Sequence, residues 1–279
     1  MKKNISLRII LSYLLLVLIA IAVIYPSFWV IMTSFREGTS LYSESIIPKN
    51  MTLDHYREIF ANDDVSPVLT WYGNTLKVAT LSMLFGTIIQ LFTAYTISRF
   101  RFKGRRVVMS SILLLSMFPG FLSLVAIYAM FQRFDLLGTH AALIIVYSAG
   151  AALGMFVAKG YFDTMPRGLE EAARIDGASH MTVFLKIFLP LSKPMLIYIA
   201  LTTFTGAFVD FVLAKAILRN DREVWTLAVG LYDMVFSSKD AKYTLFAAGA
   251  VLAAIPVTLL FLALQRFLVE GITAGSSKG

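Results

Sequence analysis

The side chains that most often carry catalysis or bind metals are few in this chain. It contains no cysteine, which excludes disulfides, thiolate nucleophiles and cysteine-ligated zinc. Its three histidines, His55, His140 and His180, lie far apart in the sequence. No Gly-Lys dipeptide occurs, so no G-x4-G-K-[ST] loop can bind the phosphates of ATP, and neither a serine nucleophile elbow nor an H-E-x-x-H motif is present. The sequence therefore predicts a protein that is not an enzyme and that binds no metal or cofactor itself.

An acidic residue inside an apolar run is the first candidate for contact with a solute. Asp210 and Lys215 are the charged residues of the run 194–218. Acids within a membrane span are costly and usually face the interior of the helix bundle, so they indicate function by default. Asp210 either lines a solute path or pairs with Lys215 as a structural neighbour near the outer end of the run.

An aromatic helix face is the second candidate for a solute path. Four residues recur at three- or seven-residue spacing: Phe118, Phe121, Tyr128 and Phe131. Such a face can stack on sugar rings, but it can equally pack against protein or lipid, and the sequence leaves both interpretations open. Pro119-Gly120 in the same run predicts a break in the helix, because proline removes a backbone donor and glycine is flexible.

A polar segment between two apolar runs, Asp163–Pro194, predicts two short helices. Asp163 or Thr164 can cap the first helix, and Pro166 suits its first turn. Gly177 can end that helix in a left-handed conformation. Ser179 can cap the second helix, which Leu189-Pro190 should stop. The pair would bend at the glycine and present small residues to another protein, or it would lie flat on its own membrane.

The surrounding elements are those of a membrane protein. The chain is 58% hydrophobic and 15% charged, with a mean hydropathy of +0.74, whereas soluble domains carry about 25% charged residues. A span needs about 20 apolar residues. We expect an all-α single permease domain over residues 1–279, with six transmembrane helices at residues 9–35, 74–98, 107–132, 137–158, 194–218 and 243–266 and a cytoplasmic loop at residues 163–190. The first run is too long for a signal peptide, so we expect it to be retained.

The distribution of basic residues predicts the orientation. The cluster RFRFKGRR (Arg99–Arg106) stands in a short loop between the second and third runs, and positive loops stay in the cytoplasm. Both termini are then cytoplasmic, with polar outer segments at 36–73, including a short helix near Leu53–Phe60, and at 219–242. We interpret the cluster as an anchor to anionic lipid headgroups rather than as a nucleic-acid site.

The polar segment resembles a known motif. Glu171-Ala172-Ala173, Gly177, Ile187 and Leu189-Pro190 match the pattern E-A-A-x3-G-x9-I-x-L-P, which is similar to the "EAA" loop of ABC importer permeases. The resemblance extends along the chain: Met117–Phe131, Trp225–Tyr232 and Gln265–Gly279 are similar to segments of maltose/maltodextrin permeases of the MalG type. The resemblance implies the type I ABC importer permease fold, in a multi-pass protein of the bacterial cytoplasmic membrane.

The resemblance also implies roles for particular residues. The loop would be the coupling helix that docks on a partner ATPase dimer, and its contact residues would be Glu170, Glu171, Ala172, Ala173, Asp176, Gly177, Ile187, Leu189 and Pro190. The outer stretch Leu218–Tyr232 would contact an external sugar-binding protein through Arg219, Asn220, Asp221 and Trp225. The tail Glu270–Gly279 would touch the interface between the two ATPase copies.

The function that the resemblance implies is import of maltodextrin or maltose-type oligosaccharides by alternating access. A second permease subunit of the MalF type would complete the path, and ATP and Mg would be used by the ATPase, with membrane lipid around the helices and no nucleic acid. Other oligosaccharides, of the raffinose type or acidic polysaccharide fragments, remain alternatives. An ion-coupled secondary transporter should carry several buried acids, and a membrane enzyme should carry an acid/base constellation. The sequence supports both of these less well.

Overall fold

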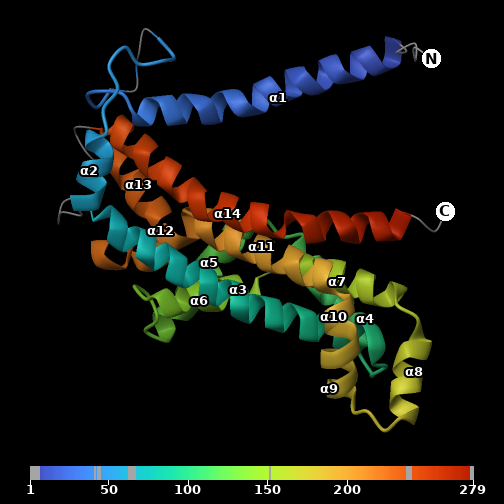
Figure 1. The fold of residues 1–279 in the computed structure, drawn as a ribbon. Coiled ribbons are helices and arrows are strands. Elements are labelled where there is room, and N and C mark those ends of the chain that lie inside the picture. Colours follow the sequence, from blue (N-terminus) through green and yellow to red (C-terminus); the bar gives the residue numbers. More distant parts are fainter. Residues whose placement is uncertain are drawn as a thin grey trace. The chain divides into compact units, whose positions relative to one another are not determined.

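The computed structural model describes residues 7–40, 42, 45–61, 67–150, 152–236 and 241–276. Within these ranges the regular elements are helices, and β-type pairing of the backbone is limited to one isolated bridge between Arg36 and Met51 (Figure 1). The predicted all-α fold is confirmed. The chain forms two compact units, one of Met1–Leu69 with Gly230–Ile255 and one of Thr70–Val229 with Pro256–Gly279.

The first unit holds three helices and part of a fourth: α1 (Leu7–Ser34), α2 (Asp54–Ala61), most of α13 (Leu227–Phe236) and the first part of α14 (Tyr243–Ser276). The short helix predicted near Leu53–Phe60 is confirmed as α2. Lys242 Nζ donates to Glu58 Oε1 at 2.6 Å, and Thr244 Oγ1 donates to the Gly38 carbonyl at 2.5 Å. These bonds attach the segments around α2 and the start of α14 to one another.

Helix α1 is apolar but does not pack into a core. Its most apolar window has a mean hydropathy of 2.7 and is 0% buried. Leaving this much apolar side-chain area in water would cost roughly 25 cal/mol per Å². Within its own unit, α1 therefore presents an apolar surface that suits lipid or another protein surface rather than water.

The second unit contains the first residues of α13, the last part of α14 and the other helices, which Figure 1 shows as a bundle with a projecting hairpin. They are α3 (Val68–Arg99), α4 (Arg105–Ser116), α5 (Gly120–Arg133), α6 (His140–Ala149), α7 (Ala152–Thr164), α8 (Arg167–Ile175), α9 (His180–Val183), the π-helix η1 (Phe184–Phe188), α10 (Leu189–Leu191), α11 (Lys193–Val209), α12 (Val212–Leu218) and the 3-10 turn η2 (Arg222–Val224).

The described helices only partly reproduce the predicted spans. Four stretches are long and apolar enough to cross a membrane, namely Arg8–Ser34, Val68–Arg99, His140–Thr164 and Tyr243–Phe267, and a bent pair around α11 makes up to five. Residues 107–132 form two helices rather than one. They are separated at the predicted Pro119-Gly120 break, where Pro119 adopts ψ 128°. Six crossings remain a prediction.

An aromatic cluster in the second unit positions the hairpin. Tyr95 of α3 is 4% exposed, and its ring centroid lies 4.8 Å from that of Phe184, 5.1 Å from Phe188 and 6.2 Å from Phe162. The π-helical turn η1 supplies both Phe184 and Phe188. Aromatic pairs at these separations contribute about 0.5–1.5 kcal/mol beyond area burial. The cluster joins α3, α7 and η1 into one core.

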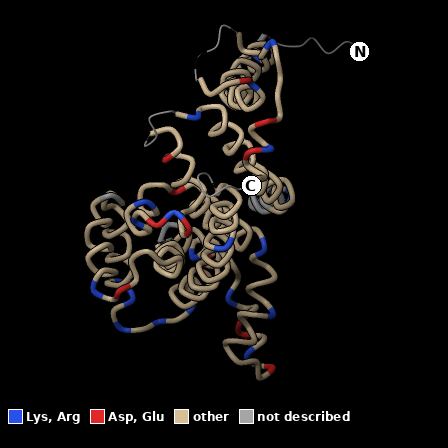
Figure 2. The backbone as a smooth tube through the Cα atoms, turned by 90° about the vertical axis from the view of Figure 1, so that its left-hand side faces the viewer, with Lys and Arg blue, Asp and Glu red and all other residues tan. Residues whose placement is uncertain are grey.

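Charged residues are distributed as a membrane protein requires. Figure 2 shows that Lys and Arg of the described chain lie mostly at helix ends and in connecting segments, while the helix middles are largely uncharged. A charge at the centre of a bilayer is costly, so this distribution suits helices immersed in lipid.

Candidate functional site

The hairpin formed by α8, α9, η1 and α10 has the bent geometry that the sequence predicts. After α8, the Gly177 N–H donates to the Arg174 carbonyl at 3.0 Å and the Ala178 N–H donates to the Ala173 carbonyl at 2.9 Å. These two bonds define a Schellman motif, and they require the left-handed φ of +85° at Gly177. Ser179 then caps α9 by accepting from the Thr182 N–H at 3.2 Å. The glycine bend and the serine cap are confirmed.

Both outer boundaries of the hairpin differ from the prediction. A cap by Asp163 or Thr164 is wrong, because α7 continues through Thr164 and Pro166 is the residue that precedes α8. The expected stop at Leu189-Pro190 is also displaced, because helical backbone continues to Leu191 before the chain bends by 81° into α11. The two arms therefore join long helices directly.

The outer face of α8 is open. Glu171, Ala172, Asp176 and Gly177 are exposed, and the apolar Ile175 is 87% exposed. An exposed isoleucine beside small residues is a surface that another protein can cover closely.

Other residues of the predicted ATPase contact face inward. The side chain of Glu170 is 16% exposed, and its carboxylate lies 3.7 Å from His180 Nδ1 on the opposite arm. The Arg174 guanidinium also contacts the ring of His180. Ile187 and Leu189 pack against the aromatic core. Glu170 therefore links the two arms of the hairpin on its inner side, and Ile187 and Leu189 pack the second arm against the bundle.

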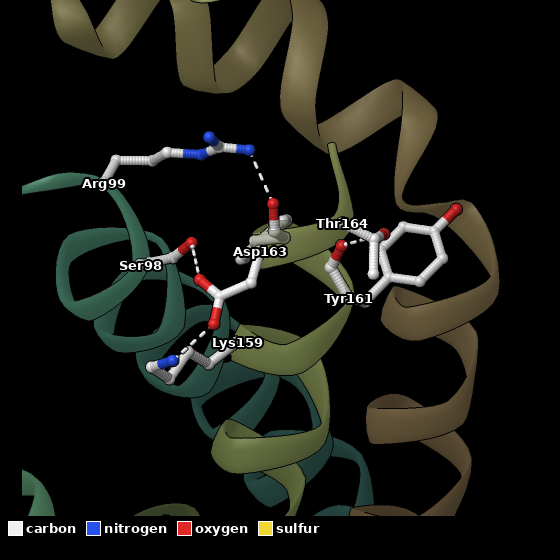
Figure 3. Close-up of polar contacts among 7 residues, drawn as sticks. Ser98, Arg99, Lys159, Tyr161, Asp163 and Thr164 are labelled. Atoms are coloured by element: carbon white, nitrogen blue, oxygen red, sulfur yellow. Dashed lines mark hydrogen bonds and ion pairs between the residues drawn. The ribbon is translucent and has the colours of Figure 1, made fainter. Parts of the chain in front are cut away.

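The base of the hairpin is fastened to the end of α3. Arg99 donates through Nη2 to the carbonyls of Phe162, at 2.5 Å, and Met165, at 3.0 Å, and its guanidinium lies 4.6 Å over the Phe188 ring. Beside it, the Asp163 carboxylate accepts from Ser98 at 2.6 Å and from Lys159 at 2.5 Å (Figure 3). The last four carbonyls of a helix have no partner within the helix, and Arg99 satisfies two carbonyls at the end of α7.

A further hydrogen bond joins the two ends of the hairpin. The Tyr161 hydroxyl of α7 donates to the Leu191 carbonyl at 3.0 Å, where the second arm ends. The sequence marked Arg99 only as part of a basic cluster and gave no role to Tyr161. The one available signal was that Arg99 stands at the end of a long apolar run.

A pocket lies between α6, α7 and the pair α11–α12, inside the second unit. Its volume is about 540 Å³, and its polar lining includes Tyr147, Tyr198, Thr202, Thr203 and Asp210. Asp210 ends α11 in an extended conformation, and its Oδ2 accepts from the Tyr147 hydroxyl at 2.6 Å and from the Ala214 N–H at 3.0 Å. Lys215 lies with its ammonium 4.1 Å over the Trp225 ring.

The comparison with known families decides the class of protein. Residues 82–274 match the model of the binding-protein-dependent transport system inner membrane component. The chain belongs to this family of membrane permeases. Because the match covers the hairpin and the pocket, both features belong to the permease's family domain.

Relatives match the permease along its whole length. The galactooligosaccharides transport system permease protein GanQ of Bacillus subtilis is 44% identical over 100% of this chain and 99% of its own. The maltodextrin transport system permease protein MdxG of the same organism is 40% identical over 97% of this chain and 96% of its own. MalG of Escherichia coli, a maltose/maltodextrin permease, is 36% identical over 99% and 98%. These relatives are transport permeases and not enzymes.

Solved structures show that the permease has the fold of ABC importer subunits. A chain of a bacterial ABC transporter that imports the acidic polysaccharide alginate superposes with a TM-score of 0.79, at 23% identity, over 92% of this chain and 95% of that one. The type I importer permease fold expected from the sequence is confirmed, and the permease is a multi-pass membrane protein.

The aromatic residues expected along a solute path do not share one environment in the permease. Phe118 is 56% exposed next to the helix break, Tyr128 is half-buried, and Phe131 is 2% exposed in the core. The side chain of Phe121 lies outside the described residues, as do those from 268 onward, which include the tail Glu270–Gly279. A core position gives Phe131 no surface for a solute in this conformation.

The loop after α12, which the sequence places outside the membrane, exposes part of its predicted binding-protein contact. Arg219, Asn220 and Asp221 are exposed, whereas Trp225 is 3% exposed. The Trp225 indole donates to the Arg219 carbonyl at 3.0 Å and its ring centroid lies 5.9 Å from that of Trp71. Trp225 is therefore buried under the loop and holds it through the hydrogen bond to the Arg219 carbonyl.

Asn74 is a positioning residue for this loop that the sequence did not suggest. Its Nδ2 donates to the carbonyls of Glu223, at 2.7 Å, and Trp225, at 3.0 Å. We expect Asn74→Ala to loosen the loop and to raise the binding-protein concentration for half-maximal ATPase stimulation about five- to tenfold, since each lost bond contributes about 1 kcal/mol. Lys77→Ala truncates an exposed side chain one turn further along α3 and serves as the control. An unchanged half-maximal concentration for Asn74→Ala would contradict this role.

Proposed function

We propose that this permease imports a neutral oligosaccharide, of the galactooligosaccharide or maltodextrin kind, as one of two permease subunits of an ATP-driven complex. The observation that carries the proposal is end-to-end similarity, at 44% and 40% identity, to permeases named for those two sugars. An ATPase dimer would supply energy from the cytoplasm, and an external binding protein would deliver the sugar. Both chain termini would be cytoplasmic.

The hairpin supports a mechanical role in this complex. Its exposed face, with Glu171 and Ile175, is free to dock on the ATPase, while Arg99, Tyr161 and the Tyr95 cluster hold its base. The second arm runs through the 81° bend into α11, which leads to the pocket at Asp210. A displacement of the hairpin would therefore be passed on to α11. Transport requires that the ATP-bound ATPase favour one conformation of the permease over the other.

The pocket chemistry favours a neutral sugar over an acidic one. Hydroxyl groups and one carboxylate line it, and like charges repel in a site of low dielectric constant. An anionic polysaccharide fragment would meet the Asp210 carboxylate. The alginate importer shares only the fold at 23% identity, so its substrate carries no weight here.

The test is sugar-dependent ATP hydrolysis and uptake by the complete complex in proteoliposomes. The binding protein is loaded in turn with a galactotriose, maltotriose or an alginate trisaccharide. We expect one of the two neutral sugars to stimulate hydrolysis and uptake about tenfold or more, equivalent to at least 1.4 kcal/mol, and uptake to persist when a protonophore collapses the proton gradient. Stimulation by the acidic trisaccharide alone, or loss of uptake with the gradient, would contradict the proposal.

A further inference from the structure

The pocket between α6 and α11 has unused hydrogen-bonding capacity. Among the described residues, both hydrogen bonds of the Asp210 carboxylate go to Oδ2, so Oδ1 accepts none. The Tyr198 hydroxyl likewise has no partner in the described part of the chain, and the Tyr147 oxygen, which donates its proton to Asp210, can accept a further bond. The residues that line the pocket thus carry acceptors and a donor that no described group of this chain uses.

A structural role accounts for only part of this arrangement. Asp210 accepts from the Ala214 N–H and so caps α12, but a cap needs one oxygen and asparagine caps about as well as aspartate. A carboxylate between two apolar helices is costly, and the second oxygen adds nothing to the cap. The volume of about 540 Å³ lies within the range of roughly 300–1,000 Å³ that small-molecule sites occupy.

Small residues keep the pocket open. Gly206 and Ala207 of α11 line it, and a Cβ added at Gly206 would meet no atom within 4 Å. The described chain therefore leaves room for a side chain to start at this position on the pocket wall. Among the described residues, the Thr202 hydroxyl on the lining bonds to two backbone carbonyls of its own helix, at 2.8 and 3.1 Å.

We propose that this pocket is a sugar subsite on this subunit, which holds one pyranose ring during transport. Asp210 Oδ1 accepts from one ring hydroxyl, and the hydroxyls of Tyr147 and Tyr198 bond neighbouring ones. The inference rests on the proposed function, because it takes a neutral oligosaccharide as the cargo. The competing occupant is a side chain of the second permease subunit, and the experiments below separate the two.

The first experiment uses the absence of cysteine from the chain. Thr202→Cys places one thiol on the pocket wall, and Ala200→Cys places one on the opposite, apolar groove of the same helix. Both variants are reconstituted with the complete complex and treated with a hydrophilic methanethiosulfonate, and the modification of this chain is measured by mass spectrometry with and without maltotriose or a galactotriose. We expect sugar to slow the modification of Thr202→Cys about tenfold, which corresponds to about 1.4 kcal/mol. The modification rate of Ala200→Cys should be the same with and without sugar. A Thr202→Cys thiol that sugar does not protect, or that never reacts because the partner fills the pocket, overturns the proposal.

The second experiment measures uptake kinetics. Asp210→Asn keeps the cap but weakens a charge-assisted hydrogen bond, so we expect the KM for sugar delivered by the binding protein to rise about tenfold. Gly206→Leu adds bulk on the pocket wall and should lower sugar uptake about tenfold or more. Ala200→Leu adds bulk to the opposite groove of the same helix and should leave uptake unchanged. Wild-type KM in Asp210→Asn together with wild-type uptake in Gly206→Leu overturns the subsite alone. A wild-type complex that takes up neither sugar overturns the proposed function, and the subsite with it.

Discussion

Replacing Gly177 by valine is expected to abolish sugar uptake while the complex still assembles in the membrane. The Schellman motif at the end of α8 requires φ of +85° at this position, and a β-branched residue there costs about 1–3 kcal/mol. The chain would relieve this strain by giving up the bonds of the Gly177 and Ala178 N–H groups, and the angle between the two arms would change. If the hairpin docks on the ATPase as proposed, a changed angle between its arms would interrupt the transmission of the ATPase motion.

The measurement is the ratio of sugar transported to ATP hydrolysed in proteoliposomes. Gly177→Asn should be milder, because asparagine tolerates the left-handed region. Gly160→Val on α7 is the matched control, since a Cβ there meets no atom within 4 Å and its φ is not positive. Equal coupling ratios for Gly177→Val and the wild type would show that the bend is not needed for transmission.

Arg99→Met is expected to weaken the attachment of the hairpin to the helix bundle, and thereby to lower the sugar uptake per ATP hydrolysed. The substitution removes two bonds from a charged donor to the Phe162 and Met165 carbonyls, and with them the contact over the Phe188 ring. Each such bond contributes about 1.5–3 kcal/mol, so we expect the hairpin to lose about 3 kcal/mol of attachment free energy. Hydrogen exchange of the backbone over residues 163–190 should accelerate by about two orders of magnitude, and uptake per ATP should fall.

The control for Arg99→Met tests the interpretation of the basic cluster as an anchor to the membrane. Arg101→Met removes the same charge from the same loop, but Arg101 is exposed. If the cluster acts only through its charge, the two variants should behave alike. We expect Arg101→Met to retain the exchange rates and coupling ratio of the wild type. Equal effects in both variants would remove the special role of Arg99.

Local chemistry explains why several elements could be predicted from the residues themselves. Gly177 favours a left-handed conformation and Ser179 favours an N-cap wherever they stand, because each acts on backbone within a few residues. The break at Pro119-Gly120 is equally local. Apolar runs and the placement of basic residues likewise depend on composition along one segment, and they indicate a membrane protein without any knowledge of its packing.

Contacts between segments distant in the sequence could not be predicted in this way. Arg99 reaches carbonyls at Phe162 and Met165, and the Tyr147 hydroxyl reaches Asp210, 63 residues further along the chain. The inward turn of Glu170 toward His180 and the burial of Trp225 also follow from how the helices pack. Hydrophobic periodicity in the sequence identifies the buried face of a helix, but it does not identify the helix that packs against that face. The sequence by itself therefore determined the all-helical class, the bend of the hairpin and the membrane class. Only the tertiary structure decided where the helices begin and end, what attaches the hairpin to the bundle and which polar groups meet in the pocket, because hydrogen bonds between helices depend on their mutual rotation and depth.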